Sequence, residues 1–194
     1  MSCPSVQPGS RDPEPLWHQV AELPAVAADI TEHQAHGRQC VGGSHRMAAT
    51  QSVAFFKICA GRGRTSFREL LGQSVEGILC TDRWGAYNIV DLAMRQLCWA
   101  HLKRDFQKWL DRGGEGLVIG QAGLEAVKRI FELWRDFRQG SIDRPTLRAK
   151  LEPVCVELHA ALEAGRGCMD KLVRRFCQNI LNVYLALWTF ARVE

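Results

Sequence analysis

The sequence predicts an α/β segment followed by an all-α block, with an irregular region ahead of both. Up to residue 112, short runs rich in β-branched and aromatic residues alternate with amphipathic stretches, which is typical of a mixed sheet flanked by helices. From residue 117 onward apolar residues recur with a period of 3.6, as in amphipathic helices. With 194 residues, of which 46% are hydrophobic and 24% charged, the chain can bury one sizeable core.

The first 46 residues contain little that predicts regular structure. Residues 1–15 hold four of the seven prolines and lack the apolar stretch of a secretory signal, so we expect a flexible lead-in there. Residues 16–46 contain four of the six histidines and one cysteine, and of these His33, His36, Cys40 and His45 are singled out as able to bind zinc. Their spacing matches no standard zinc ribbon or finger, which favours an irregular polar segment with solvated histidines.

The α/β segment, residues 47–112, begins with a strand and a short helix. "SVAFFKICA", residues 52–60, is rich in β-branched and aromatic side chains and is followed by "GRGR", so it predicts a strand. "TSFRELLG", residues 65–72, carries Ser66 and Glu69 at the spacing of a capping box and ends on glycine. This pattern predicts a helix.

Two further strands and an amphipathic helix complete this segment. The apolar run of residues 77–82 predicts a buried strand, and "RQLCW", residues 95–99, predicts another. Apolar residues then recur at helical spacing, at Leu102, Phe106, Trp109 and Leu110. They predict a helix over residues 99–112 that is stopped by the two glycines that follow it.

Residues 113–194 predict three helices with wide apolar faces. The first runs from about residue 117 to near Gly140. The second, residues 144–164, begins with an aspartate and a proline, and we expect it to kink near Pro153. The third begins after Gly167 and continues to the end of the chain. Such helices are typical of an all-α block.

Composition excludes several classes of protein. The net charge of +4 and pI near 8.7 permit a nucleic-acid partner without requiring one. Eight cysteines without a C-x-x-C pair are typical of buried thiols in a reducing compartment. The most apolar stretch, residues 180–190, is shorter than a membrane span. We therefore expect a cytoplasmic protein without a membrane partner.

Asp82 is the leading candidate for chemistry. It ends the strand 77–82, at the kind of sheet edge where open α/β sheets bind ligands, and a carboxylate there suits Mg²⁺. The alternative is structural, with the carboxylate capping the following turn through the amide of Trp84 or Gly85. One aspartate alone does not decide between these two roles.

The helix 99–112 offers a second candidate, a surface that contacts phosphates. Lys103, Arg104 and Lys108 lie on or near its polar side, where they suit a DNA backbone, although such a face is more often simply solvated. His101 follows Cys98 at C-x-x-H spacing, but one such pair does not complete a zinc site. A contact between the side chains of His101 and Asp82 would be of more functional interest than this incomplete zinc site.

Two motifs carry a resemblance to a known family. "ILCTDRWGAYN" followed by "RQLCWAHLKRDFQ" resembles the second-aspartate region of the insertion-sequence-66 family of DDE transposases. The similarity extends back through "SVAFFKI" and "FRELLG" and forward to "WTFARVE", covering about residues 50–194. "EPLWHQVAELPAVAADITEHQAHGRQC" resembles the stretch that leads out of the family's zinc-binding segment, which makes residues 16–46 a remnant of that segment.

The resemblance implies a fold and an activity. Residues 47–112 would be part of a ribonuclease-H-like core, in which three carboxylates hold two Mg²⁺ ions for DNA strand cleavage and transfer, and residues 113–194 a helical insertion. Asp82 would be the middle carboxylate, both catalytic and a metal ligand, with His101 as a candidate to support it. The implied partners are DNA at the element ends, further copies of the chain and an intact transposase, with a nucleoid location when bound to DNA.

The sequence departs from the family at three places. "GGSHRMAATQSVAFF" contains no aspartate where the family has its first catalytic strand. The family's last glutamate lies beyond the equivalent of "FARVE", so Glu194 is not its counterpart. Gly43 stands where a second cysteine would complete C-x-x-C after Cys40, so we assign no zinc ligand.

These departures predict an internally deleted and truncated copy of a transposase that is unable to transpose alone, because two divalent ions need several acidic ligands. Two alternatives remain open at this point. One is a catalytically dead fragment that binds DNA or oligomerises. The other is a structural helical interaction module that uses the apolar C-terminal helix.

Overall fold

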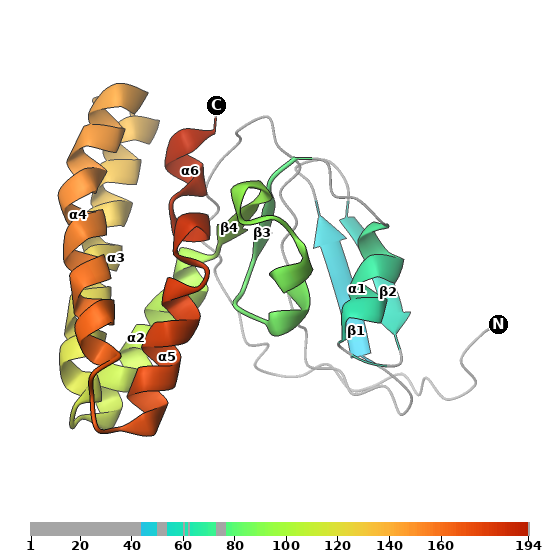
Figure 1. Cartoon of the computed structure of the whole chain (residues 1–194). Coiled ribbons are helices and arrows are strands. Elements are labelled where there is room, and N and C mark those ends of the chain that lie inside the picture. The colour runs from blue at the N-terminus through green and yellow to red at the C-terminus, as the bar shows by residue number, and fades with distance from the viewer. Residues whose placement is uncertain (1–43, 50–53, 60, 62, 73–76, 194) are drawn as a thin grey trace, which may run out of the picture. The chain divides into compact units, whose positions relative to one another are not determined.

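The computed structural model describes residues 44–49, 54–59, 61, 63–72 and 77–193. The chain forms two compact units, one reaching to Val90 and the other starting at Asp91 (Figure 1). No helix in the described ranges is both long and apolar enough to cross a membrane.

A two-stranded antiparallel sheet opens the first unit. Strand β1 spans Ser44–Ala49 and pairs with β2, Ala54–Cys59, so that Ser44 lies opposite Cys59. Strand β2 confirms the strand predicted at 52–60. Strand β1 was not predicted, and it includes His45, which lies opposite Ile58. The other three candidate zinc ligands lie outside the described residues.

Helix α1, Arg64–Leu71, confirms the predicted helix but not its predicted cap. The N-cap is Gly63, which makes no side-chain cap hydrogen bond. The capping-box prediction was wrong because the helix starts two residues before Ser66, which is buried inside it. Gly72 ends the helix with a φ of 83°, a conformation that favours glycine.

The rest of the first unit packs on α1. Strand β3, Leu79–Thr81, is shorter than the predicted strand and leads through a turn into the 3₁₀ helix η1, Gly85–Ile89. Phe67 of α1, Leu79 and Tyr87 form a buried hydrophobic cluster in this unit. The rings of Phe67 and Tyr87 meet edge to face with centroids 5.3 Å apart. This contact holds α1 against η1.

The second unit begins with the 3₁₀ helix η2, Leu92–Met94, strand β4, Arg95–Leu97, and helix α2, Trp99–Arg112. The bounds of α2 confirm the prediction from apolar spacing, and β4 confirms a strand at "RQLCW". Gly113, with a φ of 74°, ends α2 and donates its N–H to the carbonyls of Trp109 and Leu110.

Two long helices follow, α3, Gly116–Arg138, and α4, Arg144–Gly165, which lie side by side in Figure 1. The predicted start of α4 is confirmed, since the Asp143 carboxylate accepts the N–H of Thr146 at 2.9 Å. The structure has a single helix across Pro153, and the kink there stays a prediction.

The last predicted helix is three elements in the structure. Helix α5 spans Lys171–Leu181, the 3₁₀ helix η3 spans Tyr184–Leu187, and the short helix α6 spans Thr189–Arg192. The prediction of one continuous helix was wrong because buried hydrogen bonds to residues far earlier in the chain, described below, fix the backbone of residues 187–190. The ribonuclease-H-like core and the boundary at residue 112 stay predictions.

Candidate functional site

Asp82 lies in the turn that follows β3. One oxygen of its carboxylate, Oδ1, accepts the N–H of Trp84 at 2.8 Å, and its carbonyl accepts the hydroxyl of Thr81 at 2.9 Å. The side chain is half-buried, and Trp84 is 46% exposed. Two roles were considered for Asp82, a metal ligand and a cap on the following turn. The structure shows the cap, with the amide of Trp84 as its partner.

Helix α2 exposes the three cations that the sequence singled out. Lys103, Arg104 and Lys108 are all exposed, whereas Leu102 and Phe106 are fully buried. Lys108 lies 3.6 Å from the Asp105 carboxylate, and its side chain is 77% exposed, so this ion pair holds it weakly. The helix thus presents positive charge to solvent along its outer side.

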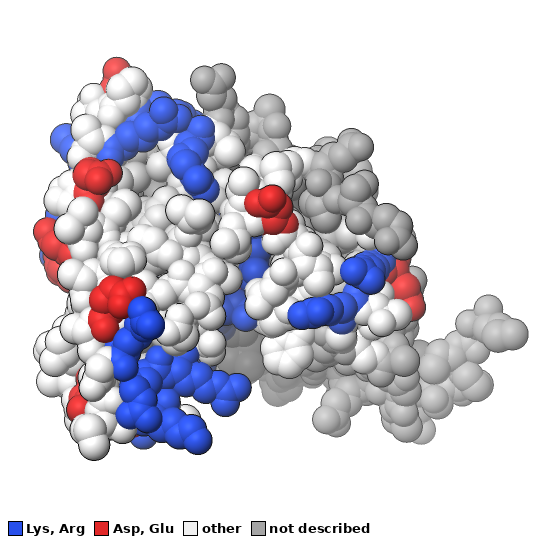
Figure 2. Space-filling view, viewed as in Figure 1, with Lys and Arg blue, Asp and Glu red and all other residues white. Residues whose placement is uncertain are grey.

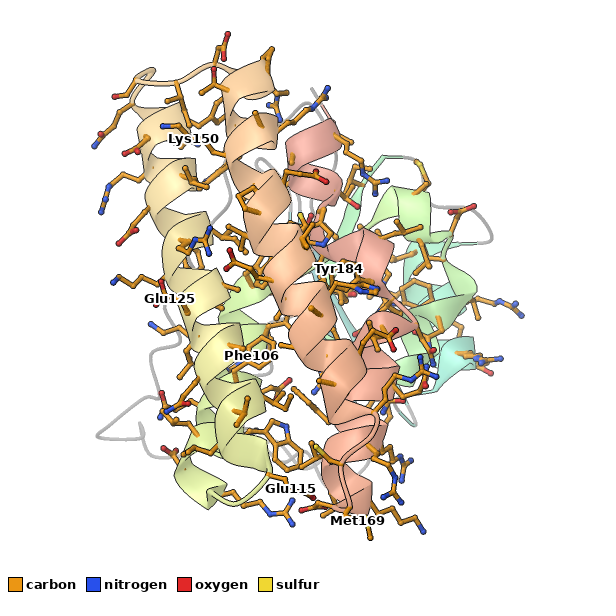
Figure 3. All side chains as sticks on the ribbon, turned by 60° about the vertical axis from the view of Figure 1, so that its left-hand side comes forward. Phe106, Glu115, Glu125, Lys150, Met169 and Tyr184 are labelled. Atoms are coloured by element: carbon orange, nitrogen blue, oxygen red, sulfur yellow. The ribbon has the colours of Figure 1, made fainter. Side chains whose placement is uncertain are left out.

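Small residues bring α3 close to the buried side of α2. Gly116, Gly120 and Gly123 of α3 face α2, and a Cβ at Gly120 would lie 2.5 Å from the backbone nitrogen of Leu110. The ring of Phe106 covers Gly123, and Figure 3 shows Phe106 between these helices. This close approach fixes the position of α2.

Buried hydrogen bonds hold the start of α2 to the C-terminal segment. The amide Nε2 of Gln96 donates to the carbonyl of Leu187 at 3.1 Å, and its Oε1 accepts the N–H of Phe190 at 2.8 Å. The indole of Trp99 also donates to Leu187, at 3.0 Å, and Thr189 donates its hydroxyl to the carbonyl of Arg95 at 2.7 Å. These groups are buried, so each bond avoids a desolvation cost.

Two arginines at the start of α4 hold the same C-terminal segment from the other side. Arg144 donates to the carbonyl of Phe190 at 2.9 Å, and Arg148 donates to those of Ala191 and Arg192 at 2.8 and 3.0 Å. Segment 186–191 is consequently buried. Burial of this segment covers much of the predicted apolar C-terminal helix, but Leu172 and Leu185 are more than half exposed, so the structural interaction module stays a prediction.

A model of one protein family, described as "Transposase IS66 family", matches residues 14–192. This match covers nearly the whole chain. The chain belongs to the IS66 transposase family. Searches of curated proteins and of solved structures gave no further match.

The residues of this IS66-family chain do not fit a pair of Mg²⁺ ions in the part that the structure describes. Within those residues no three side chains of histidine, cysteine, aspartate or glutamate converge as metal ligands. Two Mg²⁺ ions need several carboxylates, and Asp82 alone does not supply them. His101 lies half-buried in the first turn of α2, in the second unit, and its pairing with Asp82 stays a prediction.

Sequence reasoning missed the buried polar contacts that position α2. The apolar pattern predicted the helix, but the partners of Gln96 and Trp99 lie about 90 residues later in the chain. The glutamine of the predicted strand "RQLCW" was an available signal, because a buried amide requires partners. Nothing in the sequence indicates which carbonyls those partners are.

Proposed function

We propose that this IS66-family chain acts in DNA transposition by binding DNA of the element through the exposed cations of α2. The observation that carries this proposal is the combination of Lys103, Arg104 and Lys108 on the solvent side of α2 with a buried side held firmly by α3 and by Leu187. A rigid helix with outward cations suits contacts to phosphates, which position a protein on a duplex without reading its sequence.

We further propose that the chain is an incomplete copy that does not cleave DNA by itself. In the family resemblance Asp82 is one of three metal-binding carboxylates. Here the Asp82 carboxylate caps a turn, and the sequence before β2 lacks the first aspartate. The Mg²⁺ dependence of strand cleavage and the role of Asp82 as a ligand belong to the complete enzyme in this proposal.

A nicking assay tests the cleavage part. Supercoiled DNA carrying the element's terminal sequences is incubated with the chain and Mg²⁺ or Mn²⁺, beside an Asp82→Ala variant. We expect no metal-dependent nicking from either protein. Nicking by the parent chain that the substitution abolishes would show a working centre that includes Asp82, and would overturn the proposal of an incomplete copy.

A binding assay tests the DNA part. We expect a gel shift that weakens steeply between 50 and 200 mM salt, because released counterions drive phosphate contacts. A triple substitution of Lys103, Arg104 and Lys108 by glutamine should weaken the shift. Absence of any shift at 50 mM salt would refute DNA binding.

A second candidate function is interference with an intact transposase. The bundle from Asp91 onward is a compact unit that includes α2, so it can occupy DNA without the rest of a catalytic core. In a transposition assay with the intact enzyme, added chain should lower the yield of product. A yield that is unchanged under conditions where the chain binds the same DNA would exclude this function.

A further inference from the structure

Helix α5 carries two cations that the α2 surface does not include. Lys171 and Arg175 lie four residues apart and therefore on one side of the helix, and both are exposed. Figure 2 shows lysine and arginine side chains gathered over α5 at the lower end of the helical unit. Neither residue has an ion pair or side-chain hydrogen bond within the described part of the chain, so both charges are available to a partner.

The neighbouring cation of α5 has a different role. Arg174 donates to the carbonyls of Cys168 and Met169, both at 2.8 Å, and so caps the turn between α4 and α5. Glu115 accepts the N–H of Met169 at 3.0 Å from the turn between α2 and α3, and Figure 3 shows Glu115 and Met169 together at this end of the bundle. These contacts fix the start of α5.

Helices α2 and α5 run antiparallel and in contact. At one end Arg112 forms an ion pair with Asp170 at 2.9 Å, and further along α5 the ring of Phe176 packs on Phe106 and Trp109, with centroids 5.8 and 5.2 Å apart. The two helices run in opposite directions from the pair of Arg112 and Asp170. Arg175 follows Asp170 along α5 by five residues, and Lys108 precedes Arg112 along α2 by four, so these two cations lie at about the same level.

The cations of the two helices face the same outer side. Arg104, Lys108 and Arg112 recur every four residues, and Arg112 reaches α5, so this row flanks the contact with α5. On α5 the buried Cys177 lies against Gly165 of α4, whereas Arg175, two residues earlier, lies on the opposite, exposed flank.

Lys103 lies apart from this row. Consecutive residues are about 100° apart around a helix, so Lys103 does not share the side of Arg104, Lys108 and Arg112. The exposed cations that share one side therefore combine α5 with Arg104 and Lys108 and do not follow α2 alone.

We propose that Lys171 and Arg175 of α5, together with Arg104 and Lys108 of α2, form one surface that binds the phosphates of a DNA duplex. This inference rests on the proposed function, since it extends the DNA contact from α2 to a second helix. Residues four apart on a helix rise by about 6 Å, and one strand of a duplex carries a phosphate per roughly 3.4 Å of its axis, so each row spans about two phosphates.

The surface predicts a measurable salt dependence. Each phosphate contact contributes about −0.9 to the slope of log affinity against log salt concentration, so four contacts give a slope of about −3.6. Removal of the two α5 cations should change that slope by about 1.8 and weaken binding at 100 mM salt on the order of tenfold or more.

The test uses the full chain and a fluorescently labelled 30-base-pair duplex of arbitrary sequence, with anisotropy measured between 50 and 200 mM salt. The variant is Lys171→Gln/Arg175→Gln. Its matched control is Lys128→Gln/Arg135→Gln, which removes the same charge from exposed positions of α3. Circular dichroism confirms that both variants fold, as substitutions at exposed positions should.

We expect the α5 variant to lose slope and affinity while the α3 control keeps a slope close to that of the parent. Equal slopes for the α5 variant and the control, with the parent still binding, would refute the α5 surface and leave the proposed function standing. Absence of binding by the parent at 50 mM salt would refute both. Binding to phosphatidylserine vesicles but not to the duplex would assign the surface to a membrane and overturn the proposal.

Discussion

Gly120→Ala places one extra methyl group at the closest approach of α2 and α3. Its Cβ would lie 2.5 Å from the nitrogen of Leu110 and 2.9 Å from both the Leu110 Cα and the Phe106 carbonyl oxygen. Ordinary contacts begin near 3.4 Å, so the helices would have to separate by about 0.9 Å. All three atoms belong to the backbone of α2 and cannot rotate away as a side chain can.

The expected cost follows from two opposing terms. Overpacking of a well-packed core costs about 1–3 kcal/mol, and a clash with backbone falls at the upper end, about 3 kcal/mol. Alanine is about 1 kcal/mol more favourable than glycine inside a helix. The free energy of unfolding should therefore fall by about 2 kcal/mol, which lowers the melting temperature by roughly 4–8 °C for a chain of this size.

Thermal unfolding followed by circular dichroism at 222 nm measures this effect. The control is Gly85→Ala at the start of η1, where a Cβ meets nothing within 4 Å, and its stability should stay within about 0.5 kcal/mol of the parent. A Gly120→Ala protein that melts at or above the parent's temperature would show that α2 and α3 are not held in the close contact described.

Two further predictions concern buried groups of the helical unit. Gln96→Leu should lower the free energy of unfolding by about 1–3 kcal/mol in urea titrations, because the buried N–H of Phe190 loses its partner while Leu187 keeps the indole of Trp99. Burial raises the pKa of the Cys177 thiol from its ordinary value of 9.0 to about 11, so at pH 8 the thiol should react with a disulfide reagent far more slowly in the folded chain than in the unfolded chain. The same shift predicts that stability falls as the pH rises above about 9, because the unfolded chain then releases a proton that the folded chain retains.

Matched variants separate these effects from general damage. Gln107→Leu changes an exposed glutamine of α2 and should alter stability by less than about 0.5 kcal/mol, so an equal loss for both glutamine variants would contradict the role given to Gln96. For the thiol, Cys177→Ala should reduce the fall in stability between pH 8 and pH 10. An unchanged fall would mean that other groups cause it.

Local patterns were enough to locate most of the helices. The apolar spacing from Leu102 to Leu110 predicted α2 to the residue, and Asp143 predicted the start of α4, because amphipathic periodicity and capping depend on neighbours within one or two turns. The same local reasoning named the amide of Trp84 as a partner for Asp82, which is two residues away. Exposure of Lys103, Arg104 and Lys108 also followed from periodicity alone.

Only the tertiary structure decided how these elements meet. An apolar pattern shows which face of a helix is buried but not against which partner, so neither the antiparallel contact of α5 with α2 nor the shared flank of their cations was accessible from sequence. The last predicted helix ends at Leu181 because Gln96, Trp99 and two arginines of α4 bind the carbonyls and amide of the segment beyond it. Those partners are more than 40 residues away along the chain, and hydrogen bonds over that separation leave no periodic signal in the sequence.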